Sequence, residues 1–481
     1  MATRENAIEL LLSQVQTYPE IELQDLFKFI YQSAFGCEHM LADLDVAMER
    51  IRQEAENCRP HTGELVEPLN GTYCRVHLDY LKEGLRAETL GKLFFLSAEH
   101  EAEGEANLRE MVSLFIELCQ NGSLPFSGEE ATSAVEVWEN SGFAACHHSD
   151  RFRAAYAPAY RVIKKEYAMF LPLFAQIDRK RQTDSAVSAA ESTYADSTAD
   201  GRVNNKEDAK NRFILSIEGR SASGKTTLAK LLEQLYGCTV FHMDDFFLRP
   251  EQRTKERFSE PGGNVDRERF LEEVLVGLKK SQQLSYRPFD CGSQRLLPSV
   301  SVTPGNFCVV EGAYSMHPDL AGYYDFSVYL DISAEEQKKR ILKRNTPEMA
   351  ERFFSTWIPQ EETYFKAFSI KNNCNIVISA ENTTSHHRVS DKTIENVAIL
   401  AKLSLSEEQK QQAKKDMGEM LSLIDKLNEL DTSGVEPMSH IFPQNSVFRE
   451  DVLSNGDGST DTLLNAPAKK DGGILVPRTL T

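Results

Sequence analysis

Two residues near the middle of the chain have the types and the spacing of a phosphate-binding site. Lys225 and Thr226 close the stretch GRSASGKT, residues 219–226, which fits the pattern G-x-x-x-x-G-K-[ST] at every fixed position. Its two glycines permit backbone angles closed to other residues, so successive N–H groups can point at phosphate oxygens. The lysine reaches the outer phosphates and the threonine hydroxyl serves Mg²⁺. The residues expected to bind ATP are Gly219, Ser221, Ala222, Ser223, Gly224, Lys225, Thr226 and Thr227.

The segments on either side of this loop have the form that it needs. The apolar run 213–217 has the length of a strand, and four leucines recur at helical spacing over 228–235 before Gly237. The helix that begins near Lys225 adds the positive end of its dipole to the site. A glycine turn in an ordinary strand–helix unit is the alternative, and the complete motif with both flanks argues against it.

Two acidic residues follow later apolar runs of strand length. Asp244 comes after 238–243, and Glu311 comes directly after 306–310. Because ligands bind at the carboxyl ends of parallel strands, Asp244 is placed to accept a proton from a substrate hydroxyl. Glu311 is placed to support Mg²⁺, together with Thr226. For Asp244 alone, a helix N-cap or turn residue would be the commoner role.

A cationic stretch, 338–344, lies between the fourth predicted strand, 326–330, and the fifth, 376–378. Its arginines Arg340 and Arg344 could form a lid that supplies positive charge to the transferring phosphate. A basic helix is more often a solvated surface, and the neighbouring triphosphate site favours the lid. We therefore predict an α/β phosphate-loop kinase with a parallel sheet over 212–382.

This region resembles the uridine kinase branch of the uridine kinase, phosphoribulokinase and pantothenate kinase superfamily. The matching stretches are GRSASGKTT (219–227), MDDFF (243–247), NVD (264–266), YRPFD (286–290) and VVEG (309–312), with the arginine-rich lid. The resemblance implies that Asp244 is the general base and that Asp266 helps to hold ribose hydroxyls. It also implies that Arg340 and Arg344 contact phosphates and that Tyr286 lines the nucleoside pocket.

The sequence departs from this branch at one place. Such nucleoside kinases usually carry a base-contacting histidine shortly after the YDF-like stretch, and residues 291–295 contain none. The sequence therefore predicts ATP-dependent phosphorylation of a small hydroxyl compound, and leaves open whether uridine is that compound.

The N-terminal region, residues 1–182, shows apolar residues at helical spacing and reads as a mostly α domain of unknown role. Three Cys/His clusters, at 37–39, 74–77 and 146–148, could bind zinc. None has finger-type spacing, so ordinary core or surface residues are the default. Residues 183–211 are rich in Ser, Ala, Thr, Asp and Asn, and are predicted to be a flexible linker.

The C-terminal segment, residues 388–481, has a different pattern. One short helix is expected around 394–405, and Ser406 and Gln409 form a capping box that opens a second. Beyond residue 431, prolines and glycines interrupt the chain, yet apolar residues continue. This predicts a helical pair with an extended arm that orders on another protein, with a poorly ordered tail as the alternative.

Motifs throughout this segment resemble the C subunit of the aspartyl/glutamyl-tRNA(Asn/Gln) amidotransferase. They are TIENVAILAKLSLSEEQ (393–409), KLNELDTSGVEPMSH (426–440), REDV (449–452) and LLNAPAKKDGGILVPR (463–478). The resemblance implies a non-catalytic protein that wraps the A subunit, bridges it to the B subunit, and meets tRNA only indirectly. The heterotrimeric complex forms Asn-tRNA(Asn) or Gln-tRNA(Gln) from misacylated tRNA.

Composition narrows the remaining possibilities. Among 481 residues, 54 Lys and Arg against 73 Asp and Glu give a net charge of −19, which opposes general binding to nucleic acid or anionic lipid. Nine cysteines without a CxxC pair and no long apolar run indicate a cytoplasmic protein with no membrane partner. The predicted protein is a multidomain fusion of a kinase with an amidotransferase C subunit. The alternative is a kinase alone, with a C-terminal arm that is vestigial or an unrelated docking element.

Overall fold

The computed structural model describes residues 4–37, 43–61, 64–98, 104–181, 212–280, 283–379 and 459–475, and parts of 394–420. The chain forms two compact units, Met1–Thr384 and Ser385–Thr481. The predicted linker, 183–211, lies outside the described residues.

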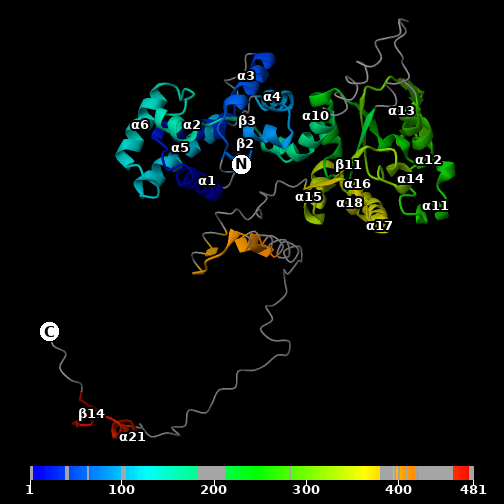
Figure 1. Cartoon of the computed structure of the whole chain (residues 1–481). Coiled ribbons are helices and arrows are strands. Elements are labelled where there is room, and N and C mark those ends of the chain that lie inside the picture. The colour runs from blue at the N-terminus through cyan, green and yellow to red at the C-terminus, as the bar shows by residue number, and fades with distance from the viewer. Residues whose placement is uncertain are drawn as a thin grey trace. The chain divides into compact units, whose positions relative to one another are not determined.

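The N-terminal part of the first unit is mostly helical, as predicted (Figure 1). Its helices are α1 (Arg4–Thr17), α2 (Leu23–Phe35), α3 (Leu44–Asn57), α4 (Ala87–Leu96), α5 (Gly104–Gln120), α6 (Gly128–Asn140), α7 (Asp150–Tyr156), α8 (Lys165–Ala168), a helical segment at 171–181, and the 3₁₀ helix η2 (Leu78–Glu83).

This part also contains a small sheet that the sequence did not predict. Strands β1 (Val66–Pro68), β2 (Tyr73–His77) and β3 (Tyr160–Lys164) pair antiparallel in the order β1-β2-β3. All five residues of β2 are buried, although Arg75 and His77 are polar. These two buried side chains hide the apolar pattern by which a core strand is normally recognised.

The kinase part is built on five parallel strands. They are β4 (Phe213–Gly219), β5 (Thr239–His242), β10 (Phe307–Glu311), β11 (Phe326–Asp331) and β12 (Ile376–Ser379), in the order β12-β11-β4-β10-β5. The five predicted strands are confirmed, with ends that differ by at most two residues. Since Glu311 pairs with both Ile217 and His242, the ends of β4, β5 and β10 meet at one edge of the sheet.

Helices and short hairpins surround this sheet (Figure 1). They are α10 (Lys225–Tyr236), α11 (Lys255–Ser259), α12 (Arg267–Phe270), α13 (Val276–Lys280), α14 (Pro318–Ala321), α15 (Ala334–Arg344), α16 (Pro347–Arg352), α17 (Ile358–Phe368) and α18 (Ile370–Asn373). There are also two 3₁₀ helices, η3 (Met243–Phe246) and η4 (Pro250–Gln252), and two π-helical segments, η5 (Leu271–Leu275) and η6 (Phe353–Trp357). Strand β6 (Leu284–Tyr286) pairs with β9 (Val300–Val302), and β7 (Phe289–Asp290) pairs with β8 (Arg295–Leu296).

The N-terminal part and the kinase part share one hydrophobic core. Phe213, Leu215 and Ile217 of β4 belong to the same buried cluster as the leucines of α10 and the N-terminal helices. At the contact, the rings of Phe174 and Tyr236 lie 6.4 Å apart. The Lys92 ammonium donates to the carbonyl of residue 235 at 2.5 Å. The two parts therefore pack as one unit through the end of α10.

In the second unit the structure confirms the predicted capping box. The N–H of Ser406 donates to Gln409 Oε1 at 2.9 Å, and the N–H of Gln409 donates to Ser406 Oγ at 3.3 Å. Within the predicted arm, α21 (Ser459–Leu464) is followed by a hairpin of β13 (Lys469–Lys470) and β14 (Gly473–Ile474). Among the described residues, no helix has the length and apolar character needed to cross a membrane.

Candidate functional site

The phosphate loop turns from the end of β4 into the start of α10. Gly219 has a φ of 148°, and a Cβ placed on it would lie 2.5 Å from the carbonyl oxygen of Leu330. Gly224 has a φ of 97° and open space where a Cβ would point. Both positions therefore require glycine, one for close packing and one for backbone conformation.

The Lys225 side chain folds back over this loop. Its ammonium donates to the carbonyl oxygens of Gly219 at 2.8 Å and of Arg220 at 2.9 Å. Ser223 Oγ is buried without a hydrogen-bond partner. A buried hydroxyl usually has a partner, so a bound phosphate oxygen would satisfy this group. The loop therefore fits the predicted ligand.

Thr226 and Glu311 meet at the start of α10, as their predicted metal role requires. Thr226 Oγ1 donates to Glu311 Oε1 at 3.0 Å. His242 Nδ1 lies 2.7 Å from the same oxygen, and this hydrogen bond raises the pKa of His242. A carboxylate and a hydroxyl supply the oxygen donors that Mg²⁺ prefers. The sequence did not single out His242, although it stands at the end of β5.

Asp244 lies in η3, immediately after β5. The residue is exposed, yet the surrounding protein partly desolvates its carboxyl group, and this desolvation raises the pKa of Asp244. Glu311 adds to this effect, whereas Lys225 and Arg344 oppose it. The predicted base, Asp244, therefore interacts electrostatically with the predicted phosphate ligand Lys225 and the predicted metal ligand Glu311. A raised pKa suits a group that must accept a proton.

The two predicted lid arginines lie on α15 and have different surroundings. The Arg340 Nη1 donates to the carbonyl of Ala222 at 3.4 Å, and its Nε donates to Glu336 at 2.9 Å. The Arg344 guanidinium lies 5.9 Å from the centre of the Phe353 ring. Arg340 therefore touches the loop, while Arg344 acts on Asp244 through its charge.

The two predicted substrate residues lie on either side of Phe246. The Asp266 N–H donates to the carbonyl of Phe246 at 2.7 Å, and the Tyr286 ring stacks on the Phe246 ring at 5.6 Å. The Asp266 carboxylate caps α12 and accepts from Gln252 Nε2 at 3.0 Å. A substrate hydroxyl would have to share this carboxylate with those partners.

Two buried acids beside the loop were not found from the sequence. Glu218 precedes Gly219, and Glu361 comes from α17. Burial raises the pKa of Glu218 to about 7. Glu218 could have been noticed from the sequence, because it is a charged residue at the end of a mostly apolar run that forms β4. No local pattern marks Glu361, because its contact with the loop arises only in the folded chain.

Several members of the predicted Cys/His clusters make hydrogen bonds, whereas His77 Nε2 is buried without a hydrogen-bond partner. Cys37 Sγ contacts the carbonyl of Phe94, and Cys74 Sγ contacts the carbonyl of Ile163. His148 lies between Asp25 and Tyr160. Across the described ranges, no group of three His, Cys, Asp or Glu side chains could hold a metal ion.

Comparison with known proteins separates the two halves of the chain. The family model described as phosphoribulokinase / uridine kinase matches residues 214–356, and the model described as Glu-tRNAGln amidotransferase C subunit matches residues 405–476. The aspartyl/glutamyl-tRNA(Asn/Gln) amidotransferase C subunit of Acetivibrio thermocellus is 44% identical over 91 residues, which is 19% of this chain and 96% of that protein. The glutamyl-tRNA(Gln) amidotransferase C subunit of Halalkalibacterium halodurans is 41% identical over 93 residues, 19% of this chain and 97% of that protein.

The chain belongs to the family of amidotransferase C subunits. The family relationship resides in its C-terminal segment, and the same chain carries a kinase-family domain. Among solved structures, a possible uridine kinase from Bacillus stearothermophilus is 23% identical, with 41% of this chain and 100% of that chain covered and a TM-score of 0.29. A TM-score at this level supports no inference about substrate.

The C-subunit segment leaves large apolar side chains exposed. Ile394 and Ala398 are buried. Met420, in contrast, is 64% exposed. Other exposed apolar residues of this unit are Val397, Leu403, Leu464, Ile474 and Leu475.

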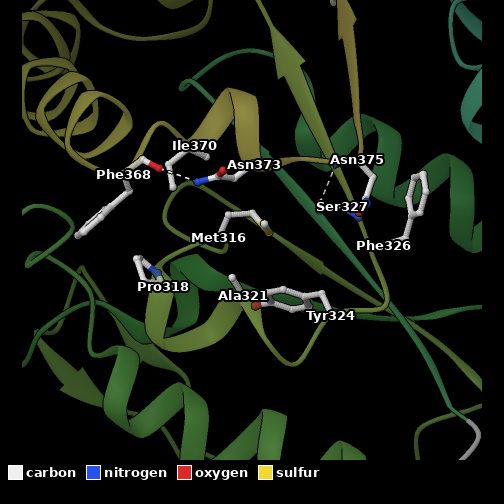
Figure 2. Close-up of a pocket in the computed structure, with 10 residues that line it drawn as sticks. All are labelled: Met316, Pro318, Ala321, Tyr324, Phe326, Ser327, Phe368, Ile370, Asn373 and Asn375. Atoms are coloured by element: carbon white, nitrogen blue, oxygen red, sulfur yellow. Dashed lines mark hydrogen bonds between the residues drawn. The ribbon is translucent and has the colours of Figure 1, made fainter.

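The kinase-family domain contains a cavity of about 370 Å³, and Figure 2 shows the residues that line it. Apolar side chains such as Met316, Phe326 and Phe368 form most of its wall, and Asn373 and Asn375 add polar groups. None of the predicted site residues lines it. The candidate nucleotide site is therefore defined by the loop and the strand ends rather than by this cavity.

Proposed function

We propose that residues 388–481 act as a non-catalytic assembly element of the tRNA-dependent amidotransferase, by joining its A and B subunits. The observation that carries this proposal is the set of large apolar side chains left exposed in the C-subunit segment, including Met420 and Leu464. Several large apolar side chains left exposed in one segment are typical of a segment that another protein covers. A segment whose role is to bury apolar surface against partner subunits needs no catalytic residue.

Charged substitutions within this surface test the assembly role. We expect Leu464→Asp with Ile474→Asp to abolish co-purification with the A and B subunits, because each new carboxylate would have to be buried in the interface. Val137→Asp is the control, since Val137 is also strongly exposed (70%) but lies in the first unit. Retention of both partners by the double variant would contradict the proposal.

We propose that the kinase-family domain transfers the γ-phosphate of ATP to a hydroxyl group of a small molecule. The contact of Thr226 with Glu311 beside the lysine of the loop carries this proposal. Bound ATP with Mg²⁺ would supply the transferable phosphoryl group. Lys225 and the loop amides would hold the phosphates, and Thr226 and Glu311 would hold the metal ion.

In this proposal Asp244 accepts the proton of the attacking hydroxyl. Its raised pKa and its proximity to the phosphate ligands suit this role. Arg340 and Arg344 stabilise negative charge on the phosphate, and Asp266 and Tyr286 bind the acceptor. A nucleoside-like acceptor agrees with an aromatic residue and an acidic residue that both contact Phe246.

A substitution of the loop lysine tests the kinase role. We expect Lys225→Ala to lower ATP turnover by about 100-fold or more, because its ammonium is the main positive charge in the loop. Lys230→Ala, an exposed position on α10, is the control. Unchanged ATP turnover in Lys225→Ala with every acceptor that the wild-type chain phosphorylates would contradict the proposal.

The proposal also includes the limits of the domains and the cellular location of the protein. Residues 1–182 form the helical domain, 183–211 a linker, 212–382 the kinase and 388–481 the C-subunit segment. Because tRNA amidation accompanies protein synthesis, we propose that the protein acts in the cytoplasm.

A further inference from the structure

Helix α17 holds the first half of the phosphate loop through several side chains. Glu361 Oε2 accepts from the Ser221 N–H at 3.0 Å, and Glu361 Oε1 accepts from the Ser221 hydroxyl. Next to it, Glu362 forms an ion pair with Arg220 at 2.6 Å. Two consecutive residues of one helix therefore bind two consecutive residues of the loop.

A third contact reaches the loop from behind. Tyr364 lies one helical turn after Glu361, and its hydroxyl donates to Glu218 Oε2 at 3.0 Å. The other Glu218 oxygen accepts from the Gly219 N–H at 2.9 Å. Glu218 and Tyr364 are fully buried and Glu361 is 3% exposed. The contacts from α17 are thus mostly inaccessible to water.

Helix α15 adds contacts on the same side of the loop. Gln337 Nε2 donates to the carbonyl of Ser221 at 3.0 Å, next to the Arg340 contact with Ala222. Elements α15, α16, η6 and α17 contact one another in sequence (Figure 1). The segment that carries the lid arginines is therefore fastened to the loop.

The carboxylate of Glu361 is unusual in its place. The Glu361 carboxylate is buried beside a loop that is proposed to bind a triphosphate. A negative charge on this carboxylate would repel the negatively charged phosphates and so oppose their binding. Burial raises the pKa of Glu361, whereas the charge of Lys225 and the hydrogen bonds from Ser221 oppose this shift. The two hydrogen bonds that Glu361 accepts from Ser221 give this buried acid a structural role that offsets the repulsion.

We propose that Glu361 is a positioning residue that sets the shape of the phosphate loop, with Tyr364 and Glu218 supporting it from behind. Glu361 fixes Ser221, while the amide groups at the start of α10, which have no partner inside the helix, remain available to phosphate. This inference rests on the proposed ATP-binding function.

Two substitutions of Glu361 separate its geometry from its charge. Glu361→Gln keeps an acceptor for the Ser221 N–H and removes the negative charge, so we expect Mg·ATP to bind as tightly as in wild type or up to about tenfold more tightly. Glu361→Ala removes both hydrogen bonds, and we expect binding to weaken by about tenfold. Lys366→Ala, an exposed position on α17, is the matched control.

The measurement is calorimetric titration of the full-length chain with Mg·ATP, tripolyphosphate and adenosine. A positioning role predicts that Glu361→Ala weakens binding of ATP and tripolyphosphate but leaves adenosine unchanged, and that Glu361→Gln restores both. Wild-type affinity in Glu361→Ala would overturn the inference, as would equal losses in Glu361→Ala and Glu361→Gln.

The same experiment also tests the proposed ATP-binding function separately. If the wild-type chain binds no ATP, or if Lys225→Ala binds it equally well, the nucleotide-binding proposal itself fails. If Glu361→Ala does not fold, Tyr364→Phe removes one hydroxyl with little change in shape. We then expect weaker binding of ATP and tripolyphosphate, again with adenosine unchanged, and unaltered binding of all three probes would overturn the inference.

Discussion

Individual side chains of the N-terminal region form a buried polar network beneath the small sheet. His148 Nδ1 lies 2.8 Å from Asp25 Oδ1, and His148 Nε2 lies 2.7 Å from the Tyr160 hydroxyl. This arrangement suits a neutral imidazole, which donates at one nitrogen and accepts at the other. Burial accordingly lowers the pKa of His148 to about 4.

The free energy of unfolding should therefore depend on pH through His148. Between about pH 6.5 and pH 4 the unfolded chain binds a proton at this residue and the folded chain does not, so stability falls as the pH falls. At about 1.4 kcal/mol per pH unit, the loss across this window is on the order of 3 kcal/mol. Urea unfolding at several pH values measures it.

Substitution of the two adjacent histidines isolates the effect. We expect His148→Gln to lose stability at pH 7.5 and to show a weaker dependence on pH between 4 and 6.5. His147→Gln, at an exposed position, should keep the wild-type dependence. Identical pH profiles for the two variants would contradict the assignment.

The candidate site could be predicted from the sequence wherever a fixed motif carries the role. Lys225 and Thr226 follow from their motif, and Glu311 follows from its place after a strand. His242 and Glu361 could not be predicted, because each acquires its partner only when distant elements pack together. His242 on β5 contacts Glu311 on the neighbouring strand β10, and Glu361 contacts Ser221, from which it is separated by 140 positions in the sequence.

Among the elements, the unit of β4, loop and α10 depends on the backbone of Gly219. We expect Gly219→Ala to destabilise the protein for two reasons. The positive φ at position 219 is strained for alanine, which costs about 1–3 kcal/mol, and a clash of the new Cβ with the carbonyl oxygen of Leu330 adds to this loss. Thermal unfolding measures the change.

Gly322→Ala is the matched control at this scale. Gly322 ends α14 with a φ of −67°, and no atom lies within 4 Å of a Cβ added there. We expect a neutral or slightly stabilising effect, since alanine restricts the unfolded chain. Equal losses in the two variants would contradict the role assigned to Gly219.

The kinase strands could be predicted because each is a short apolar run that ends at a polar or glycine-containing turn. Strand β2 could not, because Arg75 and His77 point into a buried network instead of solvent. Arg75 is only 2% exposed and donates to Gln32 at 2.9 Å. Its partners come from distant elements, so no local pattern indicates that this arginine is buried.

At the scale of the whole molecule, the N-terminal region and the kinase-family domain behave as one compact unit. The Arg181 guanidinium lies 5.2 Å from the centre of the Tyr236 ring, and Phe174 packs against the same ring. A chain limited to residues 212–384 should expose this apolar surface. We expect it to unfold at a lower temperature than residues 1–384, with calorimetry as the measurement.

A second truncation serves as the control for this comparison. We expect residues 1–384 to unfold at the same temperature as the first unit within the full-length chain, because these residues form a compact unit by themselves. If residues 212–384 were as stable as residues 1–384, the shared core would not be a stabilising feature.

Reconstitution of the amidotransferase from its A and B subunits with this chain tests the proposed assembly role directly. The measured quantity is amide formation on misacylated tRNA, with glutamine as nitrogen donor. We predict that the full-length chain supports amide formation and that residues 1–384 do not. Equal amide formation with the two chains, or none with the full-length chain despite active partners, would contradict the assembly role.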